Sequence, residues 1–232
     1  MTVAKADALR NVEFFRELSD DAFLAVSRSC HRKAFAAREL IIGQEDRSFD
    51  VLFLLTGAAR VNIYSLSGRR VSFRDITEGA IFGELSAIDG EPRSASVDCV
   101  AACTAAIMPR KAFLQALCDH PPFMMAVMKH LTKQMRRLTA RVVEFSTLAV
   151  RHRIQAELLR LAGALPSGAN TAILSPAPTH AEIASRISTH REAVTRELSW
   201  LEDKGIIAKE GRTLRLKDLG KLRMLAGEDS ED

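Results

Sequence analysis

The chain has 232 residues, of which 47% are apolar and 27% charged, and 33 basic against 29 acidic side chains give a formal net charge of +4. These values are ordinary for globular proteins and exclude disordered, collagen-like and purely coiled-coil chains. No apolar run approaches the ~20 residues that cross a bilayer, and the N-terminus lacks the apolar core of a signal peptide. We therefore expect a cytoplasmic protein with no membrane partner.

The positive charge lies entirely in the C-terminal half of the chain. Residues 1–122 hold 15 basic and 16 acidic side chains, whereas residues 123–150 hold 5 and 1, and residues 151–220 hold 11 and 8. Such a distribution indicates a polyanionic partner for the C-terminal half, with a solvated basic face as the alternative.

The sequence before residue 121 predicts two kinds of secondary structure in succession. Residues 9–29 predict short helices, and residues 38–110 predict short strands with a glycine every 11 residues, at Gly57, Gly68, Gly79 and Gly90. Evenly spaced strands with glycine turns favour a small barrel or jelly roll. The strand-like runs are Glu39–Ile42, Asp50–Leu55, Ala58–Tyr64, Arg70–Ile76 and Ser94–Met108.

Four cysteines are too few for a disulfide scaffold in a chain of this length. Cys99 and Cys103 have a spacing that metal ligands can have, but they lie in an apolar run without a nearby histidine. We interpret them as buried, inert thiols, and we predict no metal site.

A long helix is predicted from Pro121-Pro122 onward, since proline is compatible with the first turn of a helix. Its apolar residues alternate in spacings of four and three, which is the seam of a parallel coiled coil over three heptads. A homodimer helix is favoured, and a single amphipathic helix packed on its own domain is the alternative. The seam consists of Met124, Met128, Leu131, Met135, Leu138, Val142 and Phe145.

The segment FGELSAIDGEPRSASV, residues 82–97, has the residue types of a phosphate cradle. Gly83 permits close backbone approach, the N–H groups of a following helical turn favour an anion, and Arg93 and Ser94 add donors. Glu84 is unexpected beside a phosphate unless it accepts a hydrogen bond from a ribose hydroxyl. A turn in which Arg93 and Glu84 form a surface ion pair is the alternative.

This segment resembles the phosphate-binding cassette of cyclic-nucleotide-binding domains, in which F-G-E-L is followed by an arginine and a small residue. The resemblance implies that Glu84 binds the ribose and Arg93 the cyclic phosphate, that backbone N–H groups at Gly83 and Leu85 assist, and that Ser94 touches phosphate or base. It favours cAMP as effector, and a hydroxyl after the arginine keeps cGMP possible. Glu45 stands where the family commonly has a turn glycine.

In bacterial regulators of this family, a pair of hydroxyls on the dimer helix reaches the base. An ungapped alignment anchored on Arg153-Ile154 places Leu138 and Thr139 at those positions. Leu138 cannot form a hydrogen bond, so Thr139 is the single candidate, and a solvated position beside the seam is the alternative.

After a helix at Leu148–Ala162 and a loop at 163–178, residues 179–204 predict a helix-turn-helix. Ser188 or Thr189 is the expected N-cap of its second helix, Gly205 ends that helix, and a hairpin around Glu210-Gly211 forms a wing. Helix, turn, helix and wing together indicate a winged helix-turn-helix.

Three charged residues, Arg191, Glu192 and Arg196, occupy the outward face at the start of the second helix. Glu192 and Arg196 could form an ordinary surface ion pair, or the three could read base edges in the major groove. The pattern R-E-x-V-x-R resembles the recognition helix of the CRP/FNR superfamily, in its cAMP receptor protein branch, and implies a TGTGA-type half-site.

The same resemblance places Thr179 and His180 at the DNA phosphates. His190 replaces a family serine near the DNA backbone, and Ser188 replaces a turn glycine. Overall the chain is identified as a member of this bacterial superfamily, with neither a cysteine cluster for iron–sulfur binding nor a catalytic motif.

The expected architecture is α+β: a cyclic-nucleotide-binding β-roll or jelly roll (1–120), a dimerisation helix (121–148) and a winged helix-turn-helix (149–232). The expected function is that of a homodimeric transcription factor, which a cyclic nucleotide activates allosterically to bind palindromic double-stranded DNA, with RNA polymerase as a further partner. Two alternatives remain: a regulator of this family with another effector or none, and a cyclic-nucleotide-binding module that acts on a partner protein.

Overall fold

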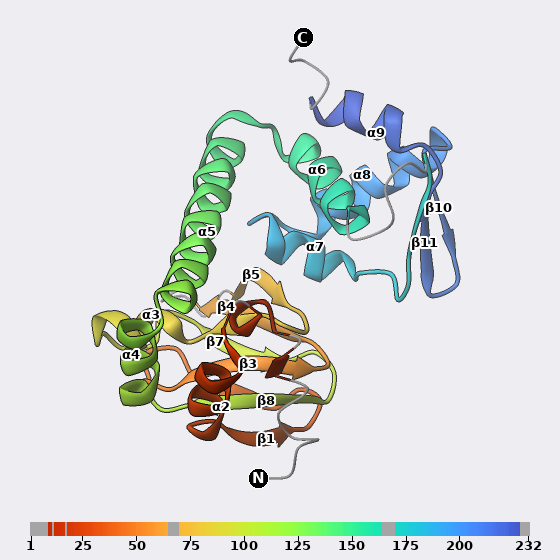
Figure 1. The fold of residues 1–232 in the computed structure, drawn as a ribbon. Coiled ribbons are helices and arrows are strands. Elements are labelled where there is room, and N and C mark those ends of the chain that lie inside the picture. The colour runs from red at the N-terminus through yellow and green to blue at the C-terminus, as the bar shows by residue number, and fades with distance from the viewer. Residues whose placement is uncertain (1–8, 11, 17, 65–69, 164–169, 228–232) are drawn as a thin grey trace. The chain divides into compact units, whose positions relative to one another are not determined.

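The structure is a computed structural model that describes residues 9–10, 12–16, 18–64, 70–163 and 170–227 (Figure 1). The chain divides into two compact units, Met1–Arg136 and Arg137–Asp232. One long helix, α5 (Pro121–Thr147), contributes residues to both units. None of the helices in the described ranges is long and apolar enough to cross a membrane.

The first unit is built from antiparallel strands with helices before and after them. Its strands form two four-stranded sheets, ordered β1-β8-β3-β6 and β2-β7-β4-β5. In chain order the elements are η1 (Glu13–Phe15), α2 (Asp20–Arg28), β1 (His31–Phe35), β2 (Leu40–Ile42), β3 (Val51–Thr56), β4 (Ala59–Tyr64), β5 (Arg70–Ile76), β6 (Ile81–Phe82), α3 (Glu84–Asp89), β7 (Ser96–Cys99), β8 (Cys103–Met108), α4 (Arg110–Asp119) and α5.

Strand β3 is apolar at every position before Thr56 because both of its faces are buried. Successive side chains of a strand point to opposite faces. Val51 and Phe53 therefore join the core beneath the helices, and Leu52 and Leu54 join the core that contains residues of both sheets. A two-sided strand of this kind accounts for the continuous apolar run in the sequence.

Aromatic rings fix the start of α5 on the first unit. Phe15 lies 4.8 Å from Phe53 and 5.4 Å from Phe123 between ring centroids, and Phe123 meets Phe113 edge-on at 6.0 Å. Phe123 is fully buried, so the first turn of α5 is part of the core of this unit.

The second unit packs helices and a three-stranded sheet, ordered β10-β11-β9, around one core. The elements after α5 are α6 (Val150–Ala162), β9 (Ala172–Leu174), α7 (His180–Arg186), α8 (Arg191–Asp203), β10 (Ile207–Glu210), β11 (Thr213–Leu216) and α9 (Leu219–Ala226). Large buried side chains of the core include Ile154, Leu158, Ile183, Leu198 and Leu201. Gly205 has a φ of +67° just after α8, as expected of a residue that ends a helix.

The α+β class, the β-roll and the winged helix-turn-helix are as predicted. The predicted strand at Ser94–Met108 is wrong in one respect, because the chain turns at Val100–Ala102 and forms two strands in different sheets. Strands β1 and β9 and helix α9 were not expected. In β1 four of the five side chains are exposed, so the strand carries no alternating apolar signal.

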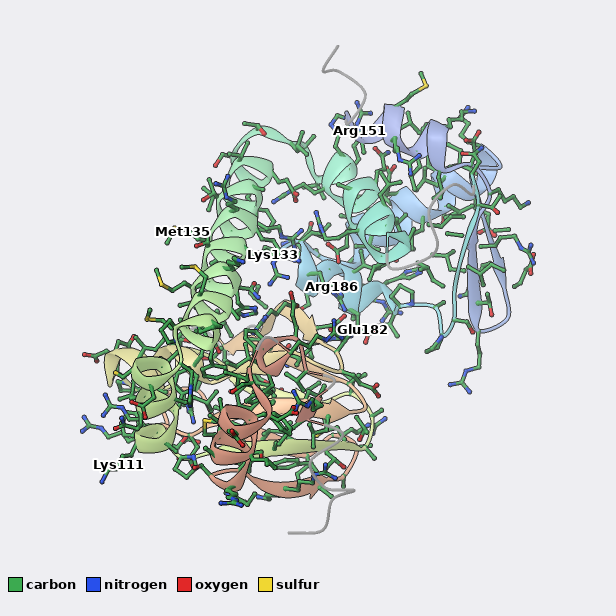
Figure 2. The ribbon with its side chains drawn as sticks, in the orientation of Figure 1. Lys111, Lys133, Met135, Arg151, Glu182 and Arg186 are labelled. Carbon is green, nitrogen blue, oxygen red and sulfur yellow. The ribbon has the colours of Figure 1, made fainter. Side chains whose placement is uncertain are left out.

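The apolar seam of α5 is largely exposed in the single chain. Met128, Met135 and Val142 are 52%, 69% and 63% exposed, and Met135 projects from the opposite side of α5 to Lys133 (Figure 2). Helix α5 begins and ends within one residue of the expected dimerisation helix. The division of the chain at residues 120 and 148 stays a prediction.

Two residues that replace family glycines have backbone conformations that glycine adopts most easily. Glu45 has a φ of +68° and Ser188 a φ of +52°. In this left-handed region the Cβ of an L-residue crowds its own carbonyl. Both residues are therefore held in a strained left-handed turn.

We predict that Ser188→Gly stabilises the second unit by about 0.5–1 kcal/mol, because relief of the left-handed conformation exceeds the entropy that glycine adds to the unfolded chain. Urea unfolding followed by the fluorescence of Trp200, the chain's single tryptophan, measures the effect. The matched change Ser199→Gly, at an exposed position inside α8, should destabilise by a similar amount. A loss of stability in both variants would contradict the prediction.

Candidate functional site

A short cassette follows β6 in the first unit, where the chain turns at Gly83 into α3. Gly83 has a φ of +80°, and a Cβ there would lie 2.7 Å from Arg93 Nη1 and 2.9 Å from the Asp50 carbonyl oxygen. Glycine is thus required at this position for two reasons, conformation and space. Helix α3 ends at Gly90 with a φ of +78°, and Arg110 Nε donates to the Ala87 carbonyl at 2.8 Å, which holds this helix in place.

The guanidinium of Arg93 is buried and held by neutral acceptors. Its Nε donates to Ser48 Oγ at 3.0 Å, its Nη1 to the Gly83 carbonyl at 2.8 Å and its Nη2 to the Asp50 carbonyl at 2.8 Å. A guanidinium has five N–H groups, so three are engaged in the described part of the chain. Burial lowers the pKa of Arg93, while Asp50, Glu84 and Asp46 raise it through their charges.

Glu84 is the first residue of α3, and its side chain is buried, with 7% exposed. Burial raises the pKa of the Glu84 carboxyl, opposed by its hydrogen bond to its own backbone and by the charges of Arg74 and Arg93. Both Arg93 and Glu84 are buried, so the alternative of a surface ion pair between them is wrong. The cassette instead brings a buried carboxylate and a buried guanidinium together, which suits a ligand with hydroxyl and anionic groups.

Two further residues belong to this site and were not predicted. Arg74 on β5 faces the charge of Glu84, and its Nη2 donates to the Ile81 carbonyl at 3.2 Å. His130 on α5 has its Nε2 3.9 Å from Glu84 Oε1 and meets the Phe14 ring edge-on at 5.4 Å. Both are far from the cassette in sequence, and they come near it through the pairing of β4 with β5 and the docking of α5.

The remaining predicted ligand contacts lie at exposed positions. Leu85 is 46% exposed, Ser94 is exposed, and Thr139 is exposed on the part of α5 that belongs to the second unit. The ligand roles of these residues stay predictions.

The first helix of the helix-turn-helix, α7, begins with a capping box. Thr179 Oγ1 accepts from the Glu182 N–H at 3.2 Å, and the Glu182 carboxylate accepts from the Thr179 N–H at 2.8 Å. His180 Nδ1 lies 2.8 Å from Thr195 Oγ1, which donates to the Arg191 carbonyl at 3.0 Å. Burial lowers the pKa of His180, and the charges of Lys209 and Arg191 lower it further.

The expected N-cap of α8 at Ser188 or Thr189 is wrong. The N-cap is His190, whose backbone is extended and whose side chain makes no capping hydrogen bond. Ser188 is in the left-handed conformation instead, and the Thr189 N–H donates to the Ala184 carbonyl at 2.9 Å. Both residues therefore belong to the turn, and His190 is left exposed at the start of α8.

Arg191, Glu192 and Arg196 are exposed in the first two turns of α8. Within the described ranges the structure records no ion pair between Glu192 and Arg196. Their side chains extend from a helix whose other face, at Val194, Leu198 and Leu201, is fixed in the core. This arrangement leaves the outer face of α8 available for an external partner.

The cysteine pair is buried without the ligands of a metal site. The sulfurs of Cys99 and Cys103 lie 3.1 Å apart in the core, and burial raises the pKa of Cys99 to about 12. In the part of the chain that the structure describes, no three His, Cys, Asp or Glu side chains gather as metal ligands would.

Comparisons with known proteins match the two domains that carry these residues. The family model for the cyclic nucleotide-binding domain matches residues 32–120, and that for the Crp-like helix-turn-helix domain matches residues 152–225. The chain is 26% identical over 186 residues to the cAMP-activated global transcriptional regulator CRP of Salmonella typhimurium, with 80% of this chain and 89% of that protein covered. It is 27% identical over 194 residues to the cAMP-activated global transcriptional regulator Vfr of Pseudomonas aeruginosa, covering 80% and 88%.

Solved structures show the same fold. A CooA variant from Carboxydothermus hydrogenoformans superposes with a TM-score of 0.76 at 19% identity, with 97% of each chain covered. A CRP-family transcriptional regulator from Thermus thermophilus has a TM-score of 0.67 at 29% identity, covering 84% of this chain and 96% of that chain.

A cyclic-nucleotide-binding domain and a helix-turn-helix on one chain define the class of transcription regulators that combine these two domains. The chain belongs to the CRP/FNR superfamily of transcription regulators. Its relatives in this superfamily are regulators and not enzymes.

We predict that Gly83→Ala destabilises the first unit by about 2–4 kcal/mol, from left-handed strain plus the displacement of the Arg93 guanidinium. Gly79→Ala is the matched control, because Gly79 has a φ of +84° with nothing within 4 Å of a Cβ. Thermal unfolding of this unit by circular dichroism measures both. Equal losses would mean that the contact with Arg93 contributes nothing.

The raised pKa of Glu84 predicts a pH-dependent cost in the ligand-free protein. The folded state binds the proton more tightly than the unfolded state, so the carboxyl stabilises most below its ordinary pKa of 4.5. This contribution is lost as the pH rises through the raised pKa. The stability advantage of Glu84→Gln over the wild type should therefore grow from about pH 4.5 to pH 8 in urea titrations. Glu91→Gln, a substitution at an exposed position of the same cassette, serves as the control. If its stability difference from the wild type grew with pH as that of Glu84→Gln does, the prediction would be contradicted.

Proposed function

We propose that the chain is a homodimeric transcription factor that a cyclic nucleotide activates, with cAMP favoured and cGMP as the second candidate. The observation that carries this proposal is the buried pair of Arg93 and Glu84 beside Gly83. In this arrangement Arg93 binds the cyclic phosphate with its remaining N–H groups, and Glu84 accepts from the ribose 2′-hydroxyl. The N–H groups at Gly83 and Leu85 and the hydroxyl of Ser94 add further donors.

The choice of cAMP is supported by the relatives CRP and Vfr, both of which are cAMP-activated regulators. A structural relative from Xanthomonas campestris, matched at 19% identity, is described as responsive to c-di-GMP. Binding experiments that compare several nucleotides therefore identify the effector of this chain. The Ser94 hydroxyl is the feature of this chain that suits cGMP.

Dimerisation through α5 is supported by its seam, whose apolar side chains are largely exposed in the single chain. Burying such a seam against a second copy removes apolar surface from water. Thr139 then lies on the dimer helix as the candidate contact to the base. A base contact that differs between two dimer arrangements is what allows a ligand to shift their populations, and a shift from 1:99 to 99:1 requires about 5.5 kcal/mol of differential binding.

The DNA-binding half of the proposal assigns base recognition to Arg191, Glu192 and Arg196. Arginine can bind guanine O6 and N7 together and glutamate can accept from cytosine N4, each at about 1–3 kcal/mol of discrimination. The proposed site is a palindrome of TGTGA-type half-sites. The start of α7 at Thr179 and His180 is assigned to phosphate, together with His190, and the Thr179 hydroxyl already serves as a cap.

The basic charge of residues 151–220 supports this assignment. The proposed setting is the cytoplasm, with RNA polymerase as a further partner.

We predict that Arg93→Ala abolishes the stimulation of DNA binding by cAMP, while weak, salt-sensitive binding to DNA persists, because the second unit keeps its basic charge. The measurement is the binding of the protein to a labelled palindromic DNA as cAMP, and then cGMP, is titrated in. Calorimetry measures the affinity of the protein for each nucleotide. Arg47→Ala is the control, since Arg47 is exposed in the loop whose Ser48 and Asp50 accept hydrogen bonds from Arg93.

Equal stimulation of Arg93→Ala and wild type would contradict the assigned ligand site. Nucleotide binding without any shift of palindromic DNA would favour the module that acts on a partner protein, and DNA binding without nucleotide binding would favour another effector.

A further inference from the structure

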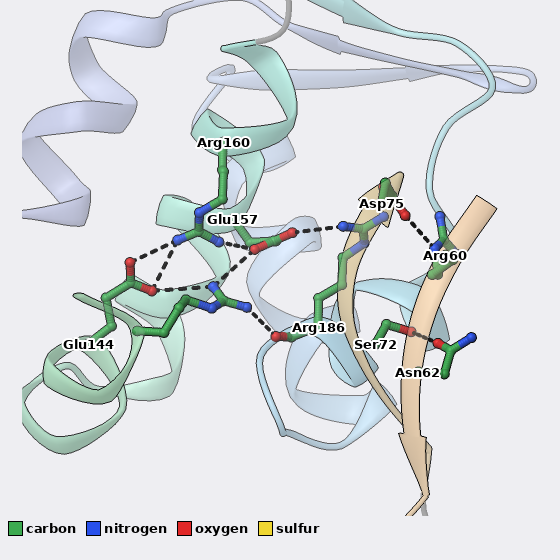
Figure 3. A network of polar contacts seen from close by, with 9 residues as sticks. Arg60, Asn62, Ser72, Asp75, Glu144, Glu157, Arg160 and Arg186 are labelled. Carbon is green, nitrogen blue, oxygen red and sulfur yellow. Dashed lines mark hydrogen bonds and ion pairs between the residues drawn. The ribbon is translucent and has the colours of Figure 1, made fainter. Parts of the chain in front are cut away.

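A buried carboxylate in the second unit joins three helices through arginine. Glu157 on α6 has a side chain that is only 2% exposed, and Arg141 Nη1 lies 3.2 Å and Arg186 Nη1 3.5 Å from its two oxygens. Arg160 contacts the same carboxylate and also lies 2.9 Å from Glu144 (Figure 3). We call these five residues the Glu157 cluster.

The members of the Glu157 cluster come from separate segments of the chain. Arg141 and Glu144 lie near the end of α5, Glu157 and Arg160 on α6, and Arg186 ends α7. Arg141 also donates to the backbone carbonyl of Arg186, where a cation is favoured because the last carbonyls of a helix carry negative partial charge. The end of α5 is therefore attached to the first helix of the helix-turn-helix both by side chain and by backbone.

A second set of contacts attaches the end of α5 to α6. Phe145, at the end of α5, has the guanidinium carbons of Arg141 and Arg153 each 5.2 Å from its ring centroid. Arg153 belongs to α6. The last turns of α5 are thus held to α6 by cation–π contacts as well as by ion pairs.

From α7 the contacts continue to the recognition helix α8. His180 meets Thr195, and Ile183 and Val194 share the core of the unit. A displacement of the end of α5 would therefore be passed through the Glu157 cluster to α7, and from α7 to α8.

The energetics favour a positioning role over a purely stabilising one. The contacts of Arg160 are partly exposed, at 38% for its side chain, and exposed ion pairs contribute little. Buried ion pairs lose hydration that offsets much of their attraction, but their directional hydrogen bonds fix geometry. The cluster holds three cations and two anions, so the Glu157 carboxylate is the charge that keeps the arginines together.

We propose that Glu157 is a positioning residue, which joins the last turns of α5 and the helix-turn-helix into one body and so passes a change in α5 to the recognition helix. This inference rests on the proposed function, since the signal that it transmits is the binding of a cyclic nucleotide. It assigns to the second unit a coupling element that is separate from the ligand site and from the DNA-reading face.

The test is the coupling ratio, which is the DNA affinity with saturating cAMP divided by the DNA affinity without it. Glu157→Gln keeps the shape of the side chain and removes its charge, and it should lower the ratio by about fivefold or more, within the usual range of allosteric couplings. Asp203→Asn removes one negative charge from an exposed position on α8 and should leave the ratio within about twofold of the wild type.

Arg141→Gln breaks the same contact from α5 and should lower the ratio as Glu157→Gln does. Because the two residues act as one unit, the double variant should lose no more than either single variant. Circular dichroism and Trp200 fluorescence establish that each variant is folded. Calorimetry should give an unchanged affinity for cAMP in the absence of DNA.

An unchanged coupling ratio in folded Glu157→Gln, or additive losses in the double variant, would overturn the proposal. If the wild type binds DNA without any response to nucleotide, the proposed function fails instead. In that case positioning is read from the DNA affinity alone, which should fall about fivefold in Glu157→Gln relative to Asp203→Asn. Equal affinities would overturn the positioning role.

Discussion

Arg93 carries its charge in a buried position where two carbonyls and a hydroxyl accept its hydrogen bonds. Such neutral acceptors engage three of the five N–H groups of the guanidinium but do not neutralise its charge. The rest of the cassette depends on this constraint. Gly83 is required because its carbonyl and the space over its Cα are both occupied by Arg93. The negative charges of Asp50, Glu84 and Asp46 partly compensate the charge of Arg93.

A site of this kind is costly in the ligand-free protein and favourable with an anion bound. Burial lowers the pKa of Arg93 and raises that of Glu84, which means that both charged forms are disfavoured where they stand. An anion bound at Arg93 would offset the cost of that buried cation, and a hydroxyl that donates to Glu84 would offset part of the cost of that buried carboxylate. Strain of this sort is common at functional sites, where stability and binding have opposing requirements.

In the second unit, a buried charge is compensated by other charges of the chain itself. In the Glu157 cluster the carboxylate is surrounded by arginines of the chain itself, so its charge is already compensated by internal partners. The cluster is therefore suited to fixing helices and not to capturing a ligand. The arginines at the start of α8 differ from both, since they are exposed to solvent on the face of the helix that points away from the core.

The residues that could be predicted from the sequence are those whose role is local. The cassette from Gly83 to Arg93 and the outer face of α8 each lie within a short segment, so their residue pattern and its resemblance to family motifs single them out as candidates. Arg74, His130 and the Glu157 cluster could not be found in this way, because their partners are brought together by strand pairing and helix packing. The N-cap of α8 was misplaced because Ser188 resembles a cap by type, whereas the left-handed turn at that residue shifts the start of the helix to His190.

Strand β3 has a practical consequence for finding the effector. Its alternate residues belong to the two cores of the first unit, so we expect the two cores to unfold together. Asp50, which receives a hydrogen bond from Arg93, immediately precedes this strand. A compound that occupies the cassette should therefore raise the melting temperature of the entire unit in proportion to the logarithm of its concentration. Thermal-shift screening of a nucleotide library is then a direct route to the physiological ligand. Circular dichroism is the method that monitors unfolding of this unit, because the only tryptophan of the chain lies in the other unit.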